Sequence, residues 1–183
     1  PGLFVIAIDN RAGAVQATQH LLAQGRRKIG VIAGPLAWWE ARERYEGWKE
    51  TLQQAGLTPS AACAAEGDWS AASGDRCMRQ LLAQRPDLDA VFVANDQMAL
   101  GALGVAHRLG RQVPQDLAIV GFDNTPESAY FWPPLTTVYQ QLVEAGRMAV
   151  QVLHRLIEAR RQGADSAEPA ATLLTPELVI RQS

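Results

Sequence analysis

The sequence predicts an α/β fold built on a doubly wound parallel sheet. Short apolar runs of strand length alternate along the chain with longer stretches whose apolar residues recur at the helical period. The run 90–94 is apolar throughout, which is typical of a strand buried on both faces of a parallel sheet. The connections between these units are short, which favours right-handed crossovers with helices covering both faces.

The length and charge of the chain limit the classes of protein to which it can belong. With 183 residues, 48% of them hydrophobic, it can form one domain or two small lobes with a real core. A formal net charge of -2 gives no sign of a nucleic-acid surface in this segment. Cys63 and Cys77 lack metal-ligand spacing and favour a reducing compartment, so we expect a cytoplasmic location. The sequence has neither a secretion signal nor an apolar stretch that could cross a membrane, so we expect no membrane partner.

The first half of the chain predicts three strands, each followed by a helix. A strand that begins almost at residue 1 suggests that the chain starts inside a fold. Gly25 and Gly56 are placed as helix stops, and Ser70 is placed as a helix N-cap. The expected elements are strand 3–8, helix 13–24, strand 29–33, a helix from about 40 to 54, a weak strand 62–66 and a helix ending near 85.

The stretch 90–101 reads as a strand, a tight turn and a helix. Asn95 lies at the carboxyl end of the strand, where open α/β sheets bind their ligands, and its amide can both donate to and accept from a polyol. Asp96 is expected to cap the helix. The alternative is that Asn95 and Asp96 supply only turn and cap chemistry.

The second half continues the alternation and then changes character. Strand 117–122 is ended by Asp123 and Asn124, and a loop rich in proline and aromatic residues follows. The remaining expected elements are a short strand 136–138, the longest helix 142–161, a polar connector 162–171 and two short strands within 172–180 that are broken at Pro176.

Enzyme motifs are missing from the sequence. It has no G-x-S-x-G elbow, no phosphate-binding loop, no G-x-G-x-x-G after a strand and no H-E-x-x-H. The three histidines all fall on expected helices, where packing or solvent-facing roles are the common case. We therefore expect a protein that is not an enzyme, without catalytic residues, cofactor or metal, although this fold class hosts many chemistries.

Polar residues near four strand ends suit a carbohydrate. Arg44, Asn95 and Asp123 offer donors and acceptors for vicinal hydroxyls, and Trp69 offers an aromatic face for the apolar side of a sugar ring. The alternatives are purely structural roles: Arg44 pairs with Glu40 on a helix surface, Trp69 is a core aromatic and Asp123 forms a turn. Together the four residues favour a ligand site.

These residues lie within motifs that resemble a known family. The runs are GVIAGP (30–35), GDWSAASG (67–74), VANDQMALGAL (93–103), VGFDNT (120–125) and PPLTTV (133–138). With an Arg-x-x-Gly-Trp element at Arg44, Gly47 and Trp48, they resemble the effector-binding core of the lac repressor family of bacterial transcription regulators. The similarity extends over nearly the whole chain, and the motifs look nearer to the lac repressor than to the ribose and purine members.

The resemblance implies a periplasmic-binding-protein-like core whose two lobes close on a small carbohydrate, with a galactoside-like ligand favoured. By this likeness Arg44, Asn95 and Asp123 match the hydroxyl-binding residues, and Trp69 matches the aromatic platform. It also implies a homodimeric repressor that a sugar releases from operator DNA, which is bound through a headpiece outside this chain. The alternative is a periplasmic sugar-binding protein of a transport system, which should carry a secretion signal. Leu142 departs from the family by replacing a ligand-packing aromatic.

The resemblance also divides the chain. Residues 1–9 match the end of the first lobe, and residues 10–139 match the second lobe. Residues 140–171 match a helix and connector that return to the first lobe, and residues 172–183 match the C-terminal strands. Most of the first lobe and the DNA-binding headpiece would lie outside this chain. Two alternatives stay open for the tryptophans Trp38, Trp39 and Trp132, namely the mouth of the cleft and a dimer contact, and no role is assigned to them.

Overall fold

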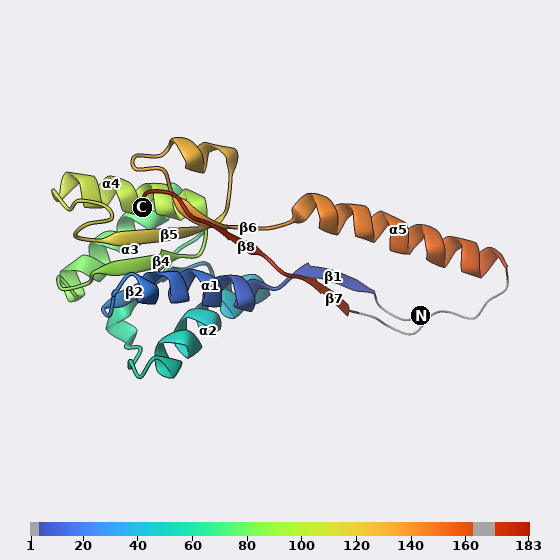
Figure 1. Ribbon diagram of the computed structural model, residues 1–183, viewed down its shortest axis with the longest axis horizontal. Coiled ribbons are helices and arrows are strands. Elements are labelled where there is room, and N and C mark those ends of the chain that lie inside the picture. The colour runs from blue at the N-terminus through green and yellow to red at the C-terminus, as the bar shows by residue number, and fades with distance from the viewer. Residues whose placement is uncertain (1–3, 163–170) are drawn as a thin grey trace.

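A six-stranded sheet forms the centre of the protein, whose computed structural model describes residues 4–162 and 171–183 (Figure 1). The strand order is β3-β2-β4-β5-β6-β8, and every neighbouring pair is parallel except β6 and β8. The strands are β2 (Ile29–Ala33), β3 (Ala64–Glu66), β4 (Ala90–Val93), β5 (Ala118–Asp123), β6 (Thr136–Tyr139) and β8 (Glu177–Val179). The predicted α/β class is confirmed, with an antiparallel edge strand that the pattern did not predict.

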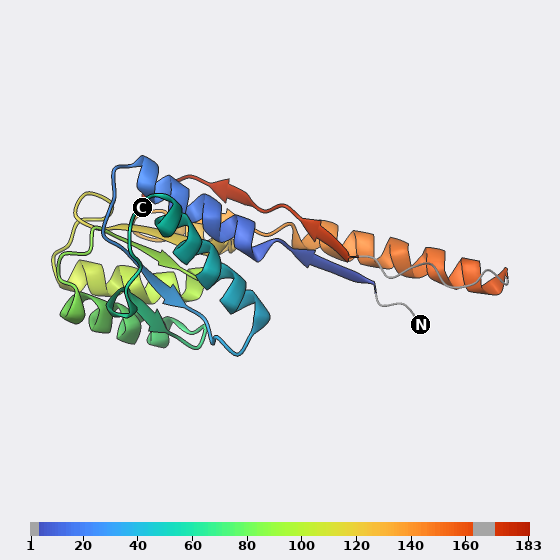
Figure 2. The ribbon, with the colours of Figure 1, turned by 90° about the horizontal axis from the view of Figure 1, so that it is seen from below.

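Helices cover both faces of this sheet, as a doubly wound fold requires. The pair α1 and α2 packs on one face and the pair α3 and α4 on the other (Figures 1 and 2). Their bounds are α1 (Asn10–Ala23), α2 (Trp39–Gln54), α3 (Ala71–Gln84) and α4 (Asp96–Arg108). We call the six-stranded sheet with these four helices the lobe.

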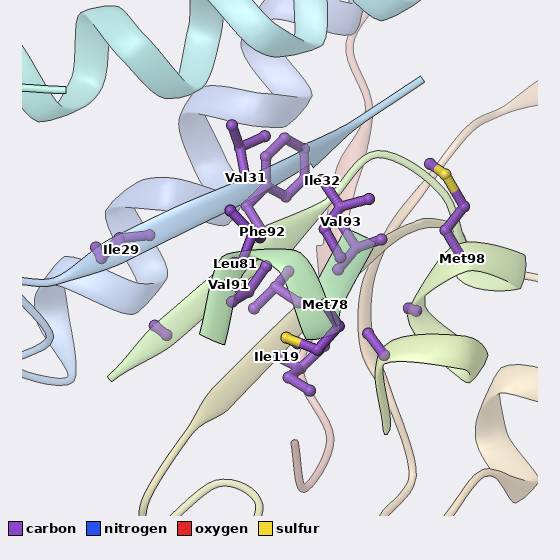
Figure 3. Close-up of a cluster of buried hydrophobic side chains, with 14 of the residues drawn as sticks. Ile29, Val31, Ile32, Met78, Leu81, Val91, Phe92, Val93, Met98 and Ile119 are labelled. Carbon is purple, nitrogen blue, oxygen red and sulfur yellow. The ribbon is translucent and has the colours of Figure 1, made fainter. Parts of the chain in front are cut away.

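The core of the lobe lies between the sheet and its helices. Strand β4 is buried along its whole length, as its apolar run predicts, and Phe92 is fully inaccessible. Figure 3 shows side chains from the central strands gathered with Met78 and Leu81 of α3 and Met98 of α4. Each large apolar side chain buried in this way contributes roughly 1.5 to 3 kcal/mol to stability. The carboxyl ends of the strands are therefore held on a rigid support.

A second part of the molecule, which we call the arm, extends away from the lobe (Figures 1 and 2). It contains a two-stranded parallel sheet of β1 (Val5–Ile8) and β7 (Ala171–Leu174), and helix α5 (Leu142–Arg161). The helix has the predicted bounds and contacts β1, yet none of its residues is buried. Of the expected strand 3–8, residues 5–8 form β1, Phe4 lies outside the strand and residue 3 lies outside the described residues. Residues 163–170 of the expected connector also lie outside the described residues.

The chain passes between lobe and arm at β1 to α1, at β6 to α5 and at β7 to β8. The first and third passages are joined by a hydrogen bond of 2.9 Å from the Asp9 N–H to the Leu174 carbonyl. The second and third are joined by the Gln141 side chain, which donates to the Thr175 carbonyl over 3.2 Å. Since β6 leaves the lobe where β8 returns to it, the two strands run in opposite directions. This explains the antiparallel edge.

Candidate functional site

The four predicted ligand residues lie around one cavity at the carboxyl ends of the lobe's parallel strands. The cavity has a volume of about 270 Å³ and is lined by Trp38, Glu40, Arg44, Trp69, Asn95 and Asp123. Helix α2 supplies Arg44, the loop after β3 supplies Trp69, the end of β4 supplies Asn95 and the end of β5 supplies Asp123. Carboxyl ends of parallel strands meet at one edge, so residues far apart in the sequence converge there.

Arg44 is buried in the floor of this cavity, with only 5% of its surface exposed. Its Nε donates to Asn10 Oδ1 over 2.7 Å, and its Nη1 donates to the Ala94 carbonyl over 2.5 Å and to Asp123 Oδ1 over 3.4 Å. The guanidinium carbon lies 3.7 Å from the centroid of the Phe122 ring. Burial lowers the pKa of Arg44, and the charge of Asp123 acts against that shift. Arg44 is therefore not the surface partner of a neighbouring glutamate.

Asp123 ends β5 in a left-handed backbone conformation, with φ of 113°. Its Oδ1 accepts from Gln140 Nε2 over 2.6 Å, in addition to the longer contact with Arg44. Burial raises the pKa of the Asp123 carboxyl, and the Arg44 charge partly offsets the increase. Among the described residues no hydrogen bond engages Oδ2. That oxygen can accept a hydrogen bond from a ligand hydroxyl.

Asn95 is both the cap of α4 and a support for the cavity wall. Its Oδ1 accepts the Met98 N–H over 2.9 Å, and its Nδ2 donates to the Trp69 carbonyl over 3.0 Å. The amide still has one N–H and one lone pair for other partners. Asn95 therefore caps the helix, and it keeps atoms with which it can also contact a ligand.

The expectation that Asp96 caps α4 is wrong. Asp96 is the first residue of the helix and is fully buried. Its Oδ1 accepts the Thr137 hydroxyl over 2.6 Å, and its Oδ2 accepts the Thr125 N–H over 2.8 Å. Burial raises the pKa of the Asp96 carboxyl to about 6, although these hydrogen bonds favour the charged form. The side chain therefore ties α4 to the turn that follows Asp123.

Trp69 is half-buried and forms a wall of the cavity. It adopts a φ of 73°, and its ring packs so closely against Gly34 that a methyl group there would overlap it. The Arg44 guanidinium carbon lies 5.7 Å from the ring centroid. Its Nε1 is buried without a hydrogen-bond partner among the described residues, which is an unfavourable state for a polar group. The ring therefore packs on the core and also faces the cavity.

Sequence reasoning assigned no role in this site to four residues that build it. Trp38 and Glu40 line the cavity, Asn10 orients Arg44, and Gln140 holds Asp123. Asn10 was missed because the predicted helix starts at residue 13, whereas α1 begins at Asn10 with the Asp9 carboxylate accepting the Ala12 N–H. Aspartate is a common N-cap residue, so Asp9 is the sequence signal that could have placed the start of α1 correctly.

Two kinds of feature are not found in the part of the chain that the structure describes. No group of three or more histidine, cysteine, aspartate or glutamate residues is arranged to hold a metal ion there. Nor does any helix within residues 4–162 combine the length and apolar character needed to span a bilayer.

The fold is of the periplasmic-binding-protein type, and comparison with known proteins agrees. Residues 18–183 match the model of the periplasmic binding protein-like domain, so the chain belongs to that family. Its relatives within the family are transcription regulators of the LacI family. A transcriptional repressor named PurR from Haemophilus influenzae is 39% identical over 171 residues, which are 93% of this chain and 50% of that protein.

Solved structures of LacI-family regulators superpose closely on this chain. A complex of the regulator CelR with cellobiose is 39% identical, has a TM-score of 0.90 and is matched over 99% of this chain and 54% of that one. A lac repressor dimer bound to operator and the anti-inducer ONPF is 37% identical, with a TM-score of 0.86 over 97% of this chain and 59% of that one.

These comparisons bear on two of the expectations. The resemblance to the lac repressor family is confirmed, but the identities of 37% to the lac repressor and 39% to PurR do not set the lac repressor apart. The chain spans about half the length of the curated relatives that it matches. These relatives are regulators of transcription and not enzymes.

Proposed function

We propose that this chain is the sugar-sensing part of a LacI-family repressor and that the cavity holds a small carbohydrate. The observation that carries the proposal is the convergence of Arg44, Asn95, Asp123 and Trp69 around one cavity at the carboxyl edge of the sheet. This convergence supports the proposal because a cation, an amide, a carboxylate and an aromatic ring are the groups that a sugar site needs. The cellobiose complex of CelR, a close structural relative, supports a carbohydrate as the ligand.

The chemistry of binding follows from the groups that remain available. Asp123 Oδ2 accepts from a sugar hydroxyl, while Arg44 and Asn95 donate to hydroxyl oxygens. Charge-assisted hydrogen bonds of this kind are the stronger ones, and the half-buried setting protects them from water. The ring of Trp69 covers the apolar face of the pyranose. The polar groups fix the orientation of the sugar, and the aromatic contact contributes affinity.

Sugar binding would control the protein by favouring one arrangement of two lobes. A ligand shifts a conformational equilibrium only by its difference in affinity between the two states. A sugar held by the lobe described here and by a facing lobe would favour the closed arrangement, as in other two-lobe binding proteins. We propose that closure releases the repressor from operator DNA. The DNA would be bound by a part of the protein outside this chain, because the chain itself carries a net charge of -2.

The remaining assignments belong to the same proposal. We place the protein in the cytoplasm as a homodimer, since an operator-bound relative is a dimer. We propose that it binds its ligand without chemical change, and incubation with galactosides and glucosides followed by chromatography tests this. The alternative of a transport-system binding protein shares the fold, whereas the relatives described above are regulators of transcription.

The identity of the sugar is open between two classes. A galactoside agrees with the lac-like motifs, and a β-glucoside agrees with the likeness to CelR. A thermal-shift screen separates them, because a ligand bound by the native state alone raises the melting temperature. We expect a stabilising sugar to alter tryptophan emission as well, and Trp69→Phe to remove most of that change. A screen in which no carbohydrate raises the melting temperature of the intact protein would contradict the proposal.

A further inference from the structure

Trp38 is presented at the rim of the cavity by a firmly held loop. Its backbone N–H donates to the Pro35 carbonyl over 2.9 Å, and its carbonyl accepts the Arg42 N–H over 3.2 Å. The Arg42 guanidinium donates to the carbonyls of Leu36 and Ala37, at 3.1 and 2.8 Å. The loop is thus fixed on both sides of Trp38, yet 58% of the tryptophan is exposed. A large aromatic residue held rigidly in water is available for contact with a ligand.

The ring of Trp38 lies beside the ring of Trp69 but at a steep angle to it. Their centroids are 6.3 Å apart, and their planes are inclined by 69°. Both rings line the same cavity, together with the carboxylate of Glu40. A pyranose stacks with its flat face parallel to one aromatic ring. Two planes inclined so steeply cannot both lie parallel to one sugar ring.

The polar groups of the site indicate where the first sugar ring lies. Arg44, Asn95 and Asp123 are grouped with Trp69, since Asn95 donates to the Trp69 carbonyl and Arg44 contacts both Asp123 and the Trp69 ring. A single pyranose held by these groups uses the face of Trp69. The face of Trp38 is then left for a second ring that is tilted against the first, as two rings joined by a glycosidic bond can be.

We propose that Trp38 forms a second aromatic subsite, so that the cavity selects a disaccharide, or a glycoside with a ring-shaped aglycone, over a free monosaccharide. Glu40 lies at this subsite and can accept hydroxyl hydrogens of the second ring. The inference rests on the proposed function, because the groups around Trp69 must hold the first ring.

The neighbouring residue Trp39 supplies a matched control. It is also an exposed tryptophan, at 42%, and it follows Trp38 directly in the sequence. It begins α2 and is not among the residues that line the cavity. Replacing either tryptophan by alanine removes the same number of atoms from adjacent positions. Of the two changes, only Trp38→Ala removes an aromatic ring that lines the cavity.

The test is calorimetry on the intact protein with paired sugars: methyl β-glucoside against cellobiose and methyl β-galactoside against lactose. We expect the disaccharide of the preferred pair to bind about tenfold more tightly than its methyl glycoside. Trp38→Ala should weaken disaccharide binding about tenfold and methyl glycoside binding much less. Trp38→Phe should restore part of the loss, and Trp39→Ala should change neither affinity. Thermal melts of the variants check that each is folded.

Two results would overturn the subsite while leaving the proposed function intact. One is equal affinity of the wild-type protein for the disaccharide and its methyl glycoside. The other is an equal loss for both ligands in Trp38→Ala, which would show that Trp38 only supports the first ring. If no carbohydrate binds at all, the proposed function fails together with the subsite, and that outcome is distinct from the other two.

Discussion

Arg44 is engaged by three protein oxygens before any ligand arrives. Asn10, Ala94 and Asp123 accept from its Nε and Nη1, and no hydrogen bond among the described residues engages Nη2. The planar guanidinium group is therefore fixed in orientation, and the N–H groups of Nη2 are still available as donors. A lysine could not reproduce this arrangement, since an ammonium group is a point charge without the fork geometry.

The first prediction concerns the two charged residues of the cavity. A hydrogen bond to a charged group contributes roughly 1.5 to 3 kcal/mol, so Arg44→Ala or Asp123→Ala should weaken sugar binding about tenfold to a hundredfold. Arg79→Ala is the control, because among the described residues the Arg79 side chain forms only an exposed ion pair with Asp75 on α3. Calorimetry of the intact protein gives the affinities. Unchanged affinity in both cavity variants would show that the sugar binds elsewhere.

The second prediction concerns Asp96 and pH. Its pKa is raised from 3.8 to about 6 in the folded protein, so between these values the folded state binds more protons than the unfolded state. The contribution of Asp96 to stability is therefore fully present below about pH 4 and is lost as pH rises through about 6. The difference in pKa corresponds to a change on the order of 3 kcal/mol.

Urea unfolding between pH 4 and pH 7 measures this effect by comparing the protein with Asp96→Asn. An asparagine can keep the acceptor for the Thr125 N–H while it cannot titrate. The free energy of unfolding of the wild type should therefore fall, relative to that of the variant, as pH rises over this range. Parallel curves for the two proteins would mean that Asp96 titrates normally in the folded state.

At the scale of elements, helices α3 and α4 approach each other so closely that glycine is required at their contact. A methyl group on Gly101 would overlap the backbone of Ala71, and one on Gly74 would overlap the backbone of Met98. Both residues lie in the first half of their helices, which follow the loop of Trp69 and Asn95. The close contact therefore sets the distance between two walls of the cavity.

The third prediction follows from this contact. Gly101→Ala should lower the free energy of unfolding by about 1 to 3 kcal/mol, because the two backbones must move apart. Gly104→Ala on the same helix is the control, since its nearest neighbour is the flexible side chain of Arg108. That variant should be neutral or more stable by up to about 1 kcal/mol, as alanine is the better helix former. Chemical denaturation measures both, and equal effects would contradict the close packing.

Local patterns were sufficient for some elements and insufficient for others. The bounds of β2 and α5 follow from an apolar run and a helical stripe, both of which are properties of the nearby sequence. The cap of α4 does not follow in this way. Asn95 and Asp96 are both good caps, and the choice depends on Thr125 and Thr137, which are remote in sequence and hold the aspartate. The position of β8 likewise depends on its pairing with a distant strand.

The part of the candidate site that lies near the carboxyl ends of strands could be predicted from the sequence. Arg44, Asn95 and Asp123 were found because they follow or face the ends of strands in a regular fold, and Trp69 because it lies near another strand end. Trp38 was not assigned a role, because its place in the cavity depends on how the loop after β2 folds back. The supporting contacts of Asn10 and Gln140 could not be predicted either, since they span 34 and 17 residues.

At the scale of the whole molecule, the arm leaves an apolar helix face in water. Val150, Leu153 and Ile157 recur at helical spacing on α5 and are 68%, 58% and 45% exposed. A cavity between the helix and β1 is lined by Phe4, Ile6 and further apolar side chains of α5. Apolar surface of this extent usually marks an interface. We propose that the facing lobe covers it in the intact protein.

The fourth prediction is that the 183-residue chain on its own self-associates through this helix. Light scattering at micromolar concentration should give a mass above that of one chain, and Val150→Glu with Leu153→Glu should reduce it. Gln151→Glu is the control, because it adds negative charge beside the apolar stripe and not within it. A strict monomer whose α5 amides are protected from hydrogen exchange would contradict both the prediction and the division of the chain into lobe and arm.

The three passages between lobe and arm restrict how these two parts can move. Asp9 and Gln141 fasten the passages to one another side by side. Pulling the parts apart would require all three passages to lengthen together and their hydrogen bonds to break. Rotation about a line through the passages needs only small torsional changes at a few residues. We therefore expect rotation at the passages to be the easiest relative motion of lobe and arm, and we expect a ligand held at the cavity rim to favour one rotated position over another.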